Sequence, residues 1–401
     1  MIQDGETTSV ALVTTALERI AETDDALKAW VWLDRDRALE EARARDQLRQ
    51  SGRALGALHG VPIGLKDIID TADMPTECGS VALASRQPEL DAVLVSRLKE
   101  AGAVILGKTA TTPFAFMDPA ATRNPHNLEY SPGGSSSGSA VAVAAGHVPV
   151  AIGTQTNGSV IRPASFCGVY GFKPSAGMIP RTGVLRTSET LDQVGVFARY
   201  YEDVALVGDV ISEFDPVDPK SFCRPRPRLL NGVCGEPPVA PNFVWVEMPY
   251  FDKLSDDSRE GMMAVLDALG GQVERLDAGE PFIGLVHSHN TIHYYEIARN
   301  LVKIRENHND TLSPQVSKLL AHGATISDQA YQDAIELRNE AISYFGSFFN
   351  DFDAIITPSA PGEAPLFSEG STGNPIFSTV WTLCGLPCLN MPVLMSENDM
   401  P

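Results

Sequence analysis

Apolar residues repeat at helical spacing near the start of the chain. They recur at intervals of three, four and three positions, at Val10, Val13, Leu17 and Ile20. This period predicts a helix that is exposed on one side. A second, highly charged helix is expected from Arg35 to Arg49, because Ser51-Gly52 follows that stretch as a typical helix stop.

From residue 61 onward, short apolar runs alternate with helical segments. Strands are expected at residues 61–65, 103–106, 148–152 and 354–357, and helices at residues 93–98 and 140–145. This alternation predicts an α/β fold in which helices pack on a largely parallel or mixed sheet. The proline-rich stretch 212–241 is expected to form an exposed loop.

The charge balance changes the picture of possible partners. The 401 residues include 31 Lys and Arg against 51 Asp and Glu, a net charge of −20 that would repel a phosphate backbone. Direct nucleic-acid binding is therefore not expected. The N-terminus resembles no secretory signal, and the weakly polar stretch 139–153 is shorter than the about 20 residues of a membrane span. We expect a cytoplasmic protein that does not contact membranes.

Neither cysteines nor histidines form a metal-binding pattern. The six cysteines contain no CxxC pair, and we expect them to be reduced, small, buried side chains. On a helix His289 and His293 would share a face, whereas His287 would point almost opposite to His289. A third ligand is missing, so core or surface histidines are favoured over a metal site, and no cofactor is expected.

Residues 102–109 match the phosphate-loop pattern G-x-x-x-x-G-K-T letter for letter. In a true phosphate loop the four variable residues form an exposed turn that points amide groups at phosphate. Here they are Ala-Val-Ile-Leu, an expected buried strand. The pattern therefore does not indicate nucleotide hydrolysis.

Residues 131–140 form a run of serines and glycines directly before an expected buried helix. A flexible linker would have this composition, but it would join domains in solvent. Tightly packed small residues instead favour a constrained backbone that larger residues cannot adopt. Downstream, residues 153–159 end a strand in a turn whose amides could converge on one point, as an oxyanion hole requires.

A serine nucleophile in this region would need a base. No histidine is well placed in the sequence, but a lysine desolvated among apolar residues can have a pKa low enough to accept a proton. Lys66 follows the apolar run 61–65 and fits this description. A second hydroxyl could relay the proton between Lys66 and the attacking serine.

These segments resemble the amidase signature family in order and spacing. The resemblance rests on Gly64-Leu65-Lys66-Asp67 and on residues 132–140 and 153–174, with support from residues 58–62 and 381–392. It covers nearly the whole chain. The family implies an α/β/α sandwich with a central mixed sheet covered by helices, and amide hydrolysis without a cofactor or metal.

The resemblance also implies roles for individual residues. Lys66 corresponds to the catalytic lysine, Ser135 to the bridging serine of a Ser-cisSer-Lys triad, and Ser159 to the acylated nucleophile. The backbone amides of three residues would form the oxyanion hole, namely Thr156, Asn157 and Gly158. Three further residues are expected to contact the substrate, namely Gly134, Ser136 and Arg162.

Two departures from the family pattern bear on specificity. Asn157 stands where the family usually has glycine, and the arginine after the nucleophile lies three residues on, at Arg162. This variant is most similar to malonamidase-type members, which act on small amides that carry a carboxylate. Arg162 would then clamp the substrate carboxylate. The alternative is a buried salt bridge that holds the loop after Ser159.

We therefore expect an amidase that converts a small carboxylate-bearing, malonamate-like primary amide to acid and ammonia. The alternatives are the glutaminase subunit of a tRNA-dependent amidotransferase and a non-enzymatic scaffold. The partner is then a small-molecule amide, with a homodimer as one possible assembly. We expect one domain with N-terminal helices (1–60), a signature core (61–204), a variable region (205–350) and a C-terminal return (351–401). The family's last strand and helix are expected to be missing after Pro401.

Overall fold

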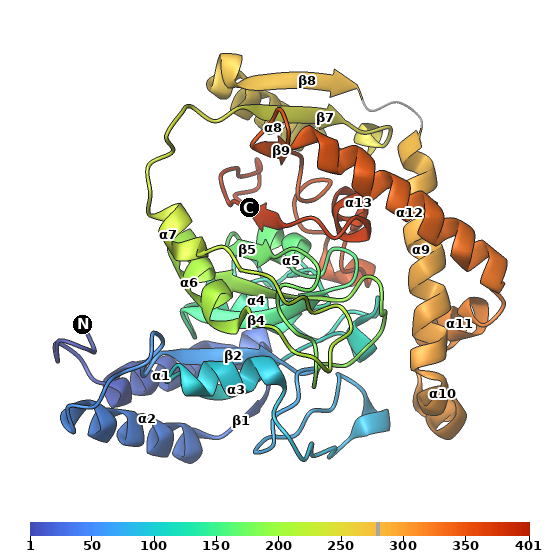
Figure 1. The fold of residues 1–401 in the computed structure, drawn as a ribbon. Coiled ribbons are helices and arrows are strands. Elements are labelled where there is room, and N and C mark those ends of the chain that lie inside the picture. Colours follow the sequence, from blue (N-terminus) through green and yellow to red (C-terminus); the bar gives the residue numbers. More distant parts are fainter. Residues whose placement is uncertain (278–280) are drawn as a thin grey trace.

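A seven-stranded mixed sheet forms the centre of the molecule (Figure 1). The computed structural model describes residues 1–277 and 281–401. Across this sheet the strand order is β1-β3-β2-β4-β6-β5-β10. The strands are β1 (Trp30–Leu33), β2 (Pro62–Lys66), β3 (Val104–Thr109), β4 (Val150–Gln155), β5 (Tyr170–Lys173), β6 (Gln193–Ala198) and β10 (Cys388–Asn390).

Strands β3, β2 and β4 run parallel to one another, whereas the other neighbouring pairs of the sheet are antiparallel. Parallel strands end at the same edge of a sheet, so the ends of β2 and β4 lie side by side. In the register of this pair, Leu65 of β2 lies beside Ile152 of β4. This arrangement brings Lys66, at the end of β2, close to the last residues of β4.

Helices cover both faces of the sheet, because successive strand residues point to opposite sides. Ile63, Leu65 and Ile105 belong to one apolar cluster, and Val104 and Leu106 belong to another. The first cluster includes side chains of α3 (Val93–Glu100) and α6 (Tyr201–Ile211). The second includes side chains of α1 (Ser9–Leu27), α2 (Arg35–Gln50), α4 (Ser137–Ala144) and α5 (Ile161–Phe166).

A second, three-stranded parallel sheet has the order β8-β7-β9 and lies at the top of Figure 1. Its strands are β7 (Phe243–Glu247), β8 (Val273–Asp277) and β9 (Ala354–Ile356). The remaining helices are α7 (Leu229–Val233), α8 (Asp256–Leu269), α9 (Pro281–Asn300), α10 (Val302–His308), α11 (Pro314–Gly323), α12 (Asp328–Phe348) and α13 (Ile376–Leu383).

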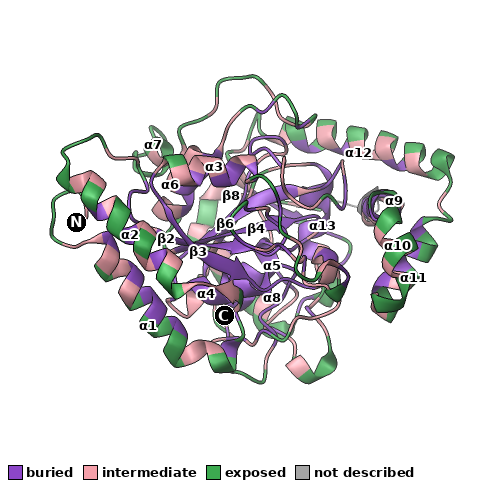
Figure 2. Cartoon of the chain, turned by 90° about the horizontal axis from the view of Figure 1, so that it is seen from below, coloured by how far each residue is buried: buried purple, intermediate pink, exposed green. Residues whose placement is uncertain are grey.

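Helices α9 to α12 form a helical arm at one side of the molecule. Exposed residues are frequent on α10 to α12, whereas the central strands β2, β3, β4 and β6 are buried (Figure 2). The arm reaches the core through α9, which carries the buried residues His289, His293 and Glu296. Part of the polypeptide far from the signature segments in sequence therefore contacts the centre of the molecule.

The α/β fold with a mixed sheet covered by helices is confirmed. Both N-terminal helices, the expected strands and the helix near residue 140 are present, with bounds shifted by a few residues. Residues 102–109 run into β3, all six residues of which are buried, so the phosphate-loop pattern encodes a strand. Among the described residues, no helix is long and apolar enough to cross a membrane.

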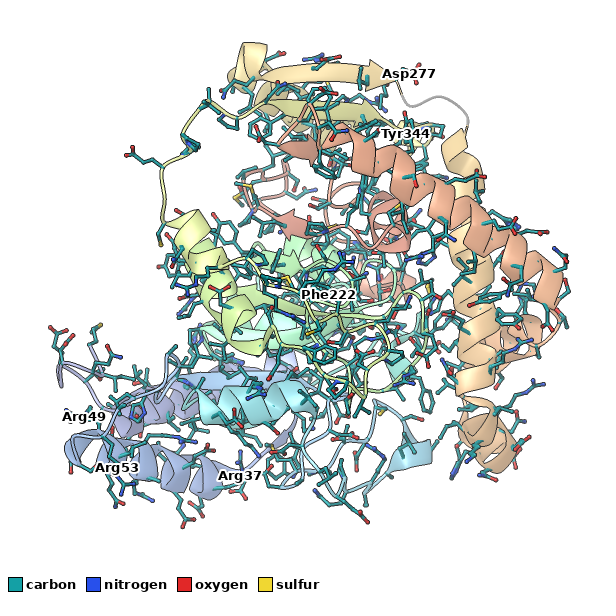
Figure 3. The ribbon with its side chains drawn as sticks, in the orientation of Figure 1. Arg37, Arg49, Arg53, Phe222, Asp277 and Tyr344 are labelled. Carbon is teal, nitrogen blue, oxygen red and sulfur yellow. The ribbon has the colours of Figure 1, made fainter. Side chains whose placement is uncertain are left out.

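Two expectations need correction. The stretch 212–241 is not entirely loop, because it contains the short helix α7. Its Phe222, labelled in Figure 3, is half-buried, and its ring lies 3.2 Å from where a Cβ atom on Gly177 would stand. The cysteines are unpaired, but Cys223 and Cys234 are exposed rather than buried. Both of these cysteines lie in the proline-rich stretch, where there is little core to cover them.

Candidate active site

Lys66 lies at the end of β2 and is completely buried. Its Nζ donates hydrogen bonds to Ser135 Oγ at 2.7 Å and to Thr154 Oγ1 at 2.8 Å. Ser135 comes from the serine- and glycine-rich segment before α4, and Thr154 from the end of β4. The parallel pairing of β2 with β4 thus brings Thr154 to Lys66, and the segment before α4 adds the hydroxyl of Ser135.

Burial lowers the pKa of Lys66 to about 7, because an ammonium group without water is unfavourable. The negative charge of Asp192 acts in the opposite direction and raises this pKa. Hydroxyl groups can both donate and accept, so they can pair with the neutral amine as well as with the ammonium. Lys66 can therefore exchange a proton near neutral pH.

The segment around Ser135 is held by close backbone packing. The Gly134–Ser135 peptide bond is cis. A Cβ atom at Gly134 would lie 2.9 Å from Thr372 Cγ2, so only glycine fits there. Ser136 Oγ accepts from the amide of Thr154 at 3.2 Å and donates to its carbonyl at 3.1 Å, which joins the segment to β4.

The turn after β4, residues 156–159, carries the expected oxyanion donors and Ser159. Contacts with neighbouring elements fix this turn through its side chains and carbonyl oxygens. Thr156 Oγ1 donates to Asp192 at 2.6 Å, and Asn157 Oδ1 accepts from Thr379 of α13 at 2.7 Å. These contacts do not use the amide nitrogens of the turn. Ser159 is 8 % exposed and lies two residues before α5.

Arg162 connects the segments that contain Ser135 and Ser159. Its guanidinium is buried and donates to the carbonyl of Gly134 at 2.8 Å, to the carbonyl of Gly373 at 2.9 Å and to Thr372 Oγ1 at 3.2 Å. The acceptors are carbonyl and hydroxyl oxygens, so the alternative of a buried salt bridge with a carboxylate is not what holds Arg162. Burial lowers the pKa of Arg162 to about 10. A contact of Arg162 with substrate stays a prediction.

Several residues of the site were not anticipated from the sequence. Thr154 was noted only as part of the segment 153–159, and Asp192 was not singled out. Loss of solvent around the half-buried Asp192 raises its pKa, but its carboxylate accepts hydrogen bonds from two hydroxyls and two amides, on Thr156, Thr187 and Ser188. These donors stabilise its carboxylate form. A narrow cavity beside Thr154 and Thr156 is also lined by Asp192.

The histidines of α9 lie as their spacing indicated. His289 and His293 are buried with ring centroids 5.9 Å apart, whereas His287 is exposed. Burial lowers the pKa of His293 to about 3, so its imidazole is neutral. Among the residues that the structure describes, no group of three His, Cys, Asp or Glu side chains is arranged to hold a metal ion.

Residues 11–401 match the Amidase family over almost the entire chain. The chain belongs to the amidase family. Its fold and its relatives identify it as an amidase-type hydrolase that acts on amides.

Two bacterial relatives show the extent of this similarity. The chain is 32 % identical to the A subunit of glutamyl-tRNA(Gln) amidotransferase from Rippkaea orientalis, with 99 % of this chain and 90 % of the relative covered. It is equally similar, at 32 %, to the A subunit of the Chlamydia pneumoniae enzyme, with 99 % of this chain and 88 % of the relative covered.

Solved structures support the same family. Peptide amidase from Stenotrophomonas maltophilia is 30 % identical and has a TM-score of 0.83, with 100 % of this chain and 90 % of the other covered. A protein from a vestigial complex that reveals the origins of an s-triazine catabolic enzyme is 28 % identical, with a TM-score of 0.93 and coverage of 100 % and 91 %.

These relatives correct the expected substrate. The assignment of a malonamate-like amide is wrong, because the curated relatives that match almost the entire chain are A subunits of glutamyl-tRNA(Gln) amidotransferases. That assignment relied on a few positions around Ser159, above all on Arg162. In the structure Arg162 is surrounded by loop acceptors, so its position in the sequence does not identify the substrate. The amidotransferase alternative has the better support.

Proposed function

We propose that the amidase hydrolyses amides through a Ser159 acyl-enzyme, with Lys66 and Ser135 as its proton relay. The observation that carries this proposal is the hydrogen bond of 2.7 Å between Lys66 Nζ and Ser135 Oγ, in a site where burial lowers the pKa of Lys66 to about 7. A neutral amine at this position can accept a proton at physiological pH.

In the acylation step, Ser159 Oγ attacks the amide carbonyl carbon. Its proton moves to Ser135 Oγ while the proton of Ser135 moves to Lys66 Nζ. When the tetrahedral intermediate collapses, the carbon–nitrogen bond breaks, and a proton returns through Ser135 to the departing nitrogen, which leaves as ammonia. Water then attacks the Ser159 ester by the same relay, which releases the acid and restores Ser159.

The negative charge that develops on the carbonyl oxygen needs donors that are already oriented. The amides of Thr156, Asn157 and Gly158 serve this purpose in the proposed mechanism. Support comes from the hydrogen bonds that hold the turn. They are made by its side chains and carbonyl oxygens and do not use these three amides, which can therefore donate to a substrate oxygen.

For the substrate, we propose the side-chain carboxamide of glutamine. The support is the similarity to the A subunits of glutamyl-tRNA(Gln) amidotransferases over nearly the full length of both proteins. The chain would then act as the ammonia-releasing component of an assembly. A net charge of −20 is consistent with leaving contact with the tRNA to other components.

The test compares ammonia release from glutamine, from a C-terminal peptide amide and from malonamate. We expect glutamine to give the highest kcat/KM, and mass spectrometry of stopped reactions to find a glutamyl adduct on Ser159. Ser159→Ala should lower kcat by on the order of 10³- to 10⁶-fold. If the chain works within an amidotransferase, it should also co-purify with a second protein from the source cells.

Each outcome bears on a different part of the proposal. Preference for the peptide amide or malonamate would overturn the glutamine assignment and leave the chemistry in place. Near wild-type turnover by Ser159→Ala would overturn the nucleophile itself.

A further inference from the structure

Helix α9 of the helical arm touches the proposed oxyanion turn through a polar contact. His289 Nε2 lies 2.9 Å from the carbonyl oxygen of Thr156, and the His289 side chain is completely buried. A carbonyl oxygen can only accept a hydrogen bond, so Nε2 must carry the proton. The other ring nitrogen, Nδ1, lies 3.4 Å from Asn290 Oδ1.

Burial lowers the pKa of His289, because an imidazolium without water is unfavourable, and this favours the neutral imidazole. A neutral ring with its proton on Nε2 has one donor, and the Thr156 carbonyl uses it. The ring of His293 packs against His289 at 5.9 Å in an edge-to-face arrangement, which limits its rotation. His289 therefore presents a fixed donor to the turn.

A second donor of the same kind comes from α13. Thr382 Oγ1 donates to the carbonyl of Asn157 at 2.5 Å. Its hydroxyl in turn accepts from Gln155 Nε2 at 2.9 Å, which fixes the direction in which the hydroxyl points. Two consecutive carbonyl groups of the turn, those of Thr156 and Asn157, thus each receive one buried side-chain donor.

The geometry of the peptide unit gives these contacts a consequence. A carbonyl group and the amide of the following residue share one rigid plane and point in opposite directions in a trans peptide. The Thr156 carbonyl therefore shares a plane with the amide of Asn157, and the Asn157 carbonyl with the amide of Gly158. A donor on the carbonyl side also polarises the amide group on the other side of the same unit.

We propose that His289 and Thr382 are positioning residues that hold and polarise the peptide units whose amides, on Asn157 and Gly158, bind the developing oxyanion. This inference rests on the proposed function, because it requires the turn to face the reacting carbonyl. It assigns a role in the reaction to the helical arm, which contributes no member of the proposed triad.

Helix α9 also reaches the other side of Thr156. Glu296 accepts hydrogen bonds from the amide and hydroxyl of Thr190, at 3.0 and 2.6 Å, and from Ser188 Oγ. This loop includes Asp192, the acceptor for the Thr156 hydroxyl. The position of α9 therefore affects both hydrogen bonds of Thr156. The bond to its carbonyl comes directly from His289, and the bond from its hydroxyl to Asp192 depends on the loop that Glu296 holds.

The test uses pairs of variants that either remove or retain a donor. His289→Leu removes the donor, whereas His289→Gln offers an amide donor near the position of Nε2. Thr382→Val and Thr382→Ser form the equivalent pair on α13. His287→Ala is the matched control on α9, because His287 is exposed on the opposite side of the helix from His289.

We expect His289→Leu and Thr382→Val each to lower kcat by roughly 10- to 100-fold, somewhat less than the 10²- to 10³-fold effect of deleting an oxyanion donor. KM should stay within about twofold, since the contacts act on the transition state. The affinity for an aldehyde analogue of the substrate, which forms a tetrahedral adduct with the nucleophile, should fall in parallel with kcat. His289→Gln and Thr382→Ser should recover most of the loss.

Wild-type kcat and aldehyde affinity in both His289→Leu and Thr382→Val would overturn this inference while the triad stands. A loss that the retaining variants fail to recover, with KM and kcat changed together, would also overturn it and assign the residues to folding alone. A wild-type enzyme whose turnover does not depend on Ser159 would overturn the proposed function, and this inference with it.

Discussion

Lys66 and Lys173 are both completely buried at the ends of strands of the same sheet, yet their surroundings differ. Lys66 meets two hydroxyl groups, on Ser135 and Thr154. Lys173 Nζ donates to the side-chain oxygen of Gln193 at 2.8 Å, to the carbonyl of Pro174 at 3.3 Å and to the carbonyl of Leu386.

The comparison shows that partners, more than burial, decide what a buried lysine can do. Burial lowers the pKa of both residues. The three oxygens around Lys173 can only accept hydrogen bonds. Nζ must therefore donate one hydrogen to each of them, which favours the ammonium form with its three hydrogens. The hydroxyls around Lys66 accept or donate, so they tolerate loss of its proton and can pass it on. Lys173 therefore holds structure, and Lys66 is suited to proton transfer.

The strongest test of this difference between Lys66 and Lys173 is to replace each lysine by methionine, which is similar in length and apolar. Lys66→Met should lower kcat/KM for amide hydrolysis by on the order of 10³- to 10⁶-fold, because the relay loses its base. Its free energy of unfolding should stay the same or rise, since a desolvated amine is removed. Chemical denaturation and steady-state kinetics on the same preparation measure both quantities.

Lys66→Arg should lower kcat/KM to a similar extent, because a guanidinium stays protonated and cannot act as the base. The double variant of Lys66→Met with Ser135→Ala should be no slower than the slower single variant, because one proton path passes through both residues. Losses that multiply would contradict a shared relay.

Lys173→Met should show the opposite behaviour. Three buried oxygens would lose their donor, so the free energy of unfolding should fall by about 3 kcal/mol, within the range for unsatisfied buried polar groups. The kcat of the protein that remains folded should change little. Urea denaturation monitored by tryptophan fluorescence provides the stability, and active-site titration the folded fraction. A catalytic loss without destabilisation would remove the distinction between the two lysines.

A smaller effect is expected from Thr154, the second hydroxyl on Lys66. Thr154→Val keeps the shape but removes the hydroxyl, and we expect a loss in kcat of roughly tenfold, the scale of one hydrogen bond. Thr154→Ser retains the hydroxyl and serves as the matched control. Equal rates for the Val and Ser variants would show that Ser135 alone positions the amine.

The smallest effect concerns the pH dependence. The rate requires neutral Lys66, so kcat/KM should rise with pH through the pKa of this residue, about 7. The charge of Asp192 raises that pKa, so Asp192→Asn should move the rise toward lower pH. Glu189→Gln removes a half-exposed carboxylate three residues away and should leave the profile unchanged. A shift toward higher pH in Asp192→Asn would contradict the proposed charge effect.

Features that depend only on neighbouring residues in the chain could be predicted from the sequence. Lys66 follows an apolar run that forms β2, and Ser135 lies in a stretch of small residues too compact for a linker. Lys66 and this serine- and glycine-rich stretch were therefore identifiable before any tertiary contact was known, as was the turn 153–159 as a candidate oxyanion hole. The resemblance to the amidase signature family added the expected roles of Ser135 and Ser159.

The remaining parts depend on contacts between distant segments. Thr154 is one polar residue in a buried strand, and only the pairing of β4 with β2 shows that it faces Lys66. His289 and Thr382 lie 133 and 225 residues from their acceptors, so no local spacing connects them. The second sheet was missed because only the pairing of β7 with β8 on one side and with β9 on the other defines it.

The contacts of α13 with Asn157 also determine when the enzyme could become active during its synthesis. Lys66, Ser135 and Ser159 all leave the ribosome early, but Thr379 and Thr382 follow Asn157 by 222 and 225 residues. Until this late helix emerges and docks, the turn beside Ser159 lacks two of its donors. A nascent chain therefore carries the proposed nucleophile long before the contacts that hold the proposed oxyanion turn can form, and the turn is completed only after α13 has been made.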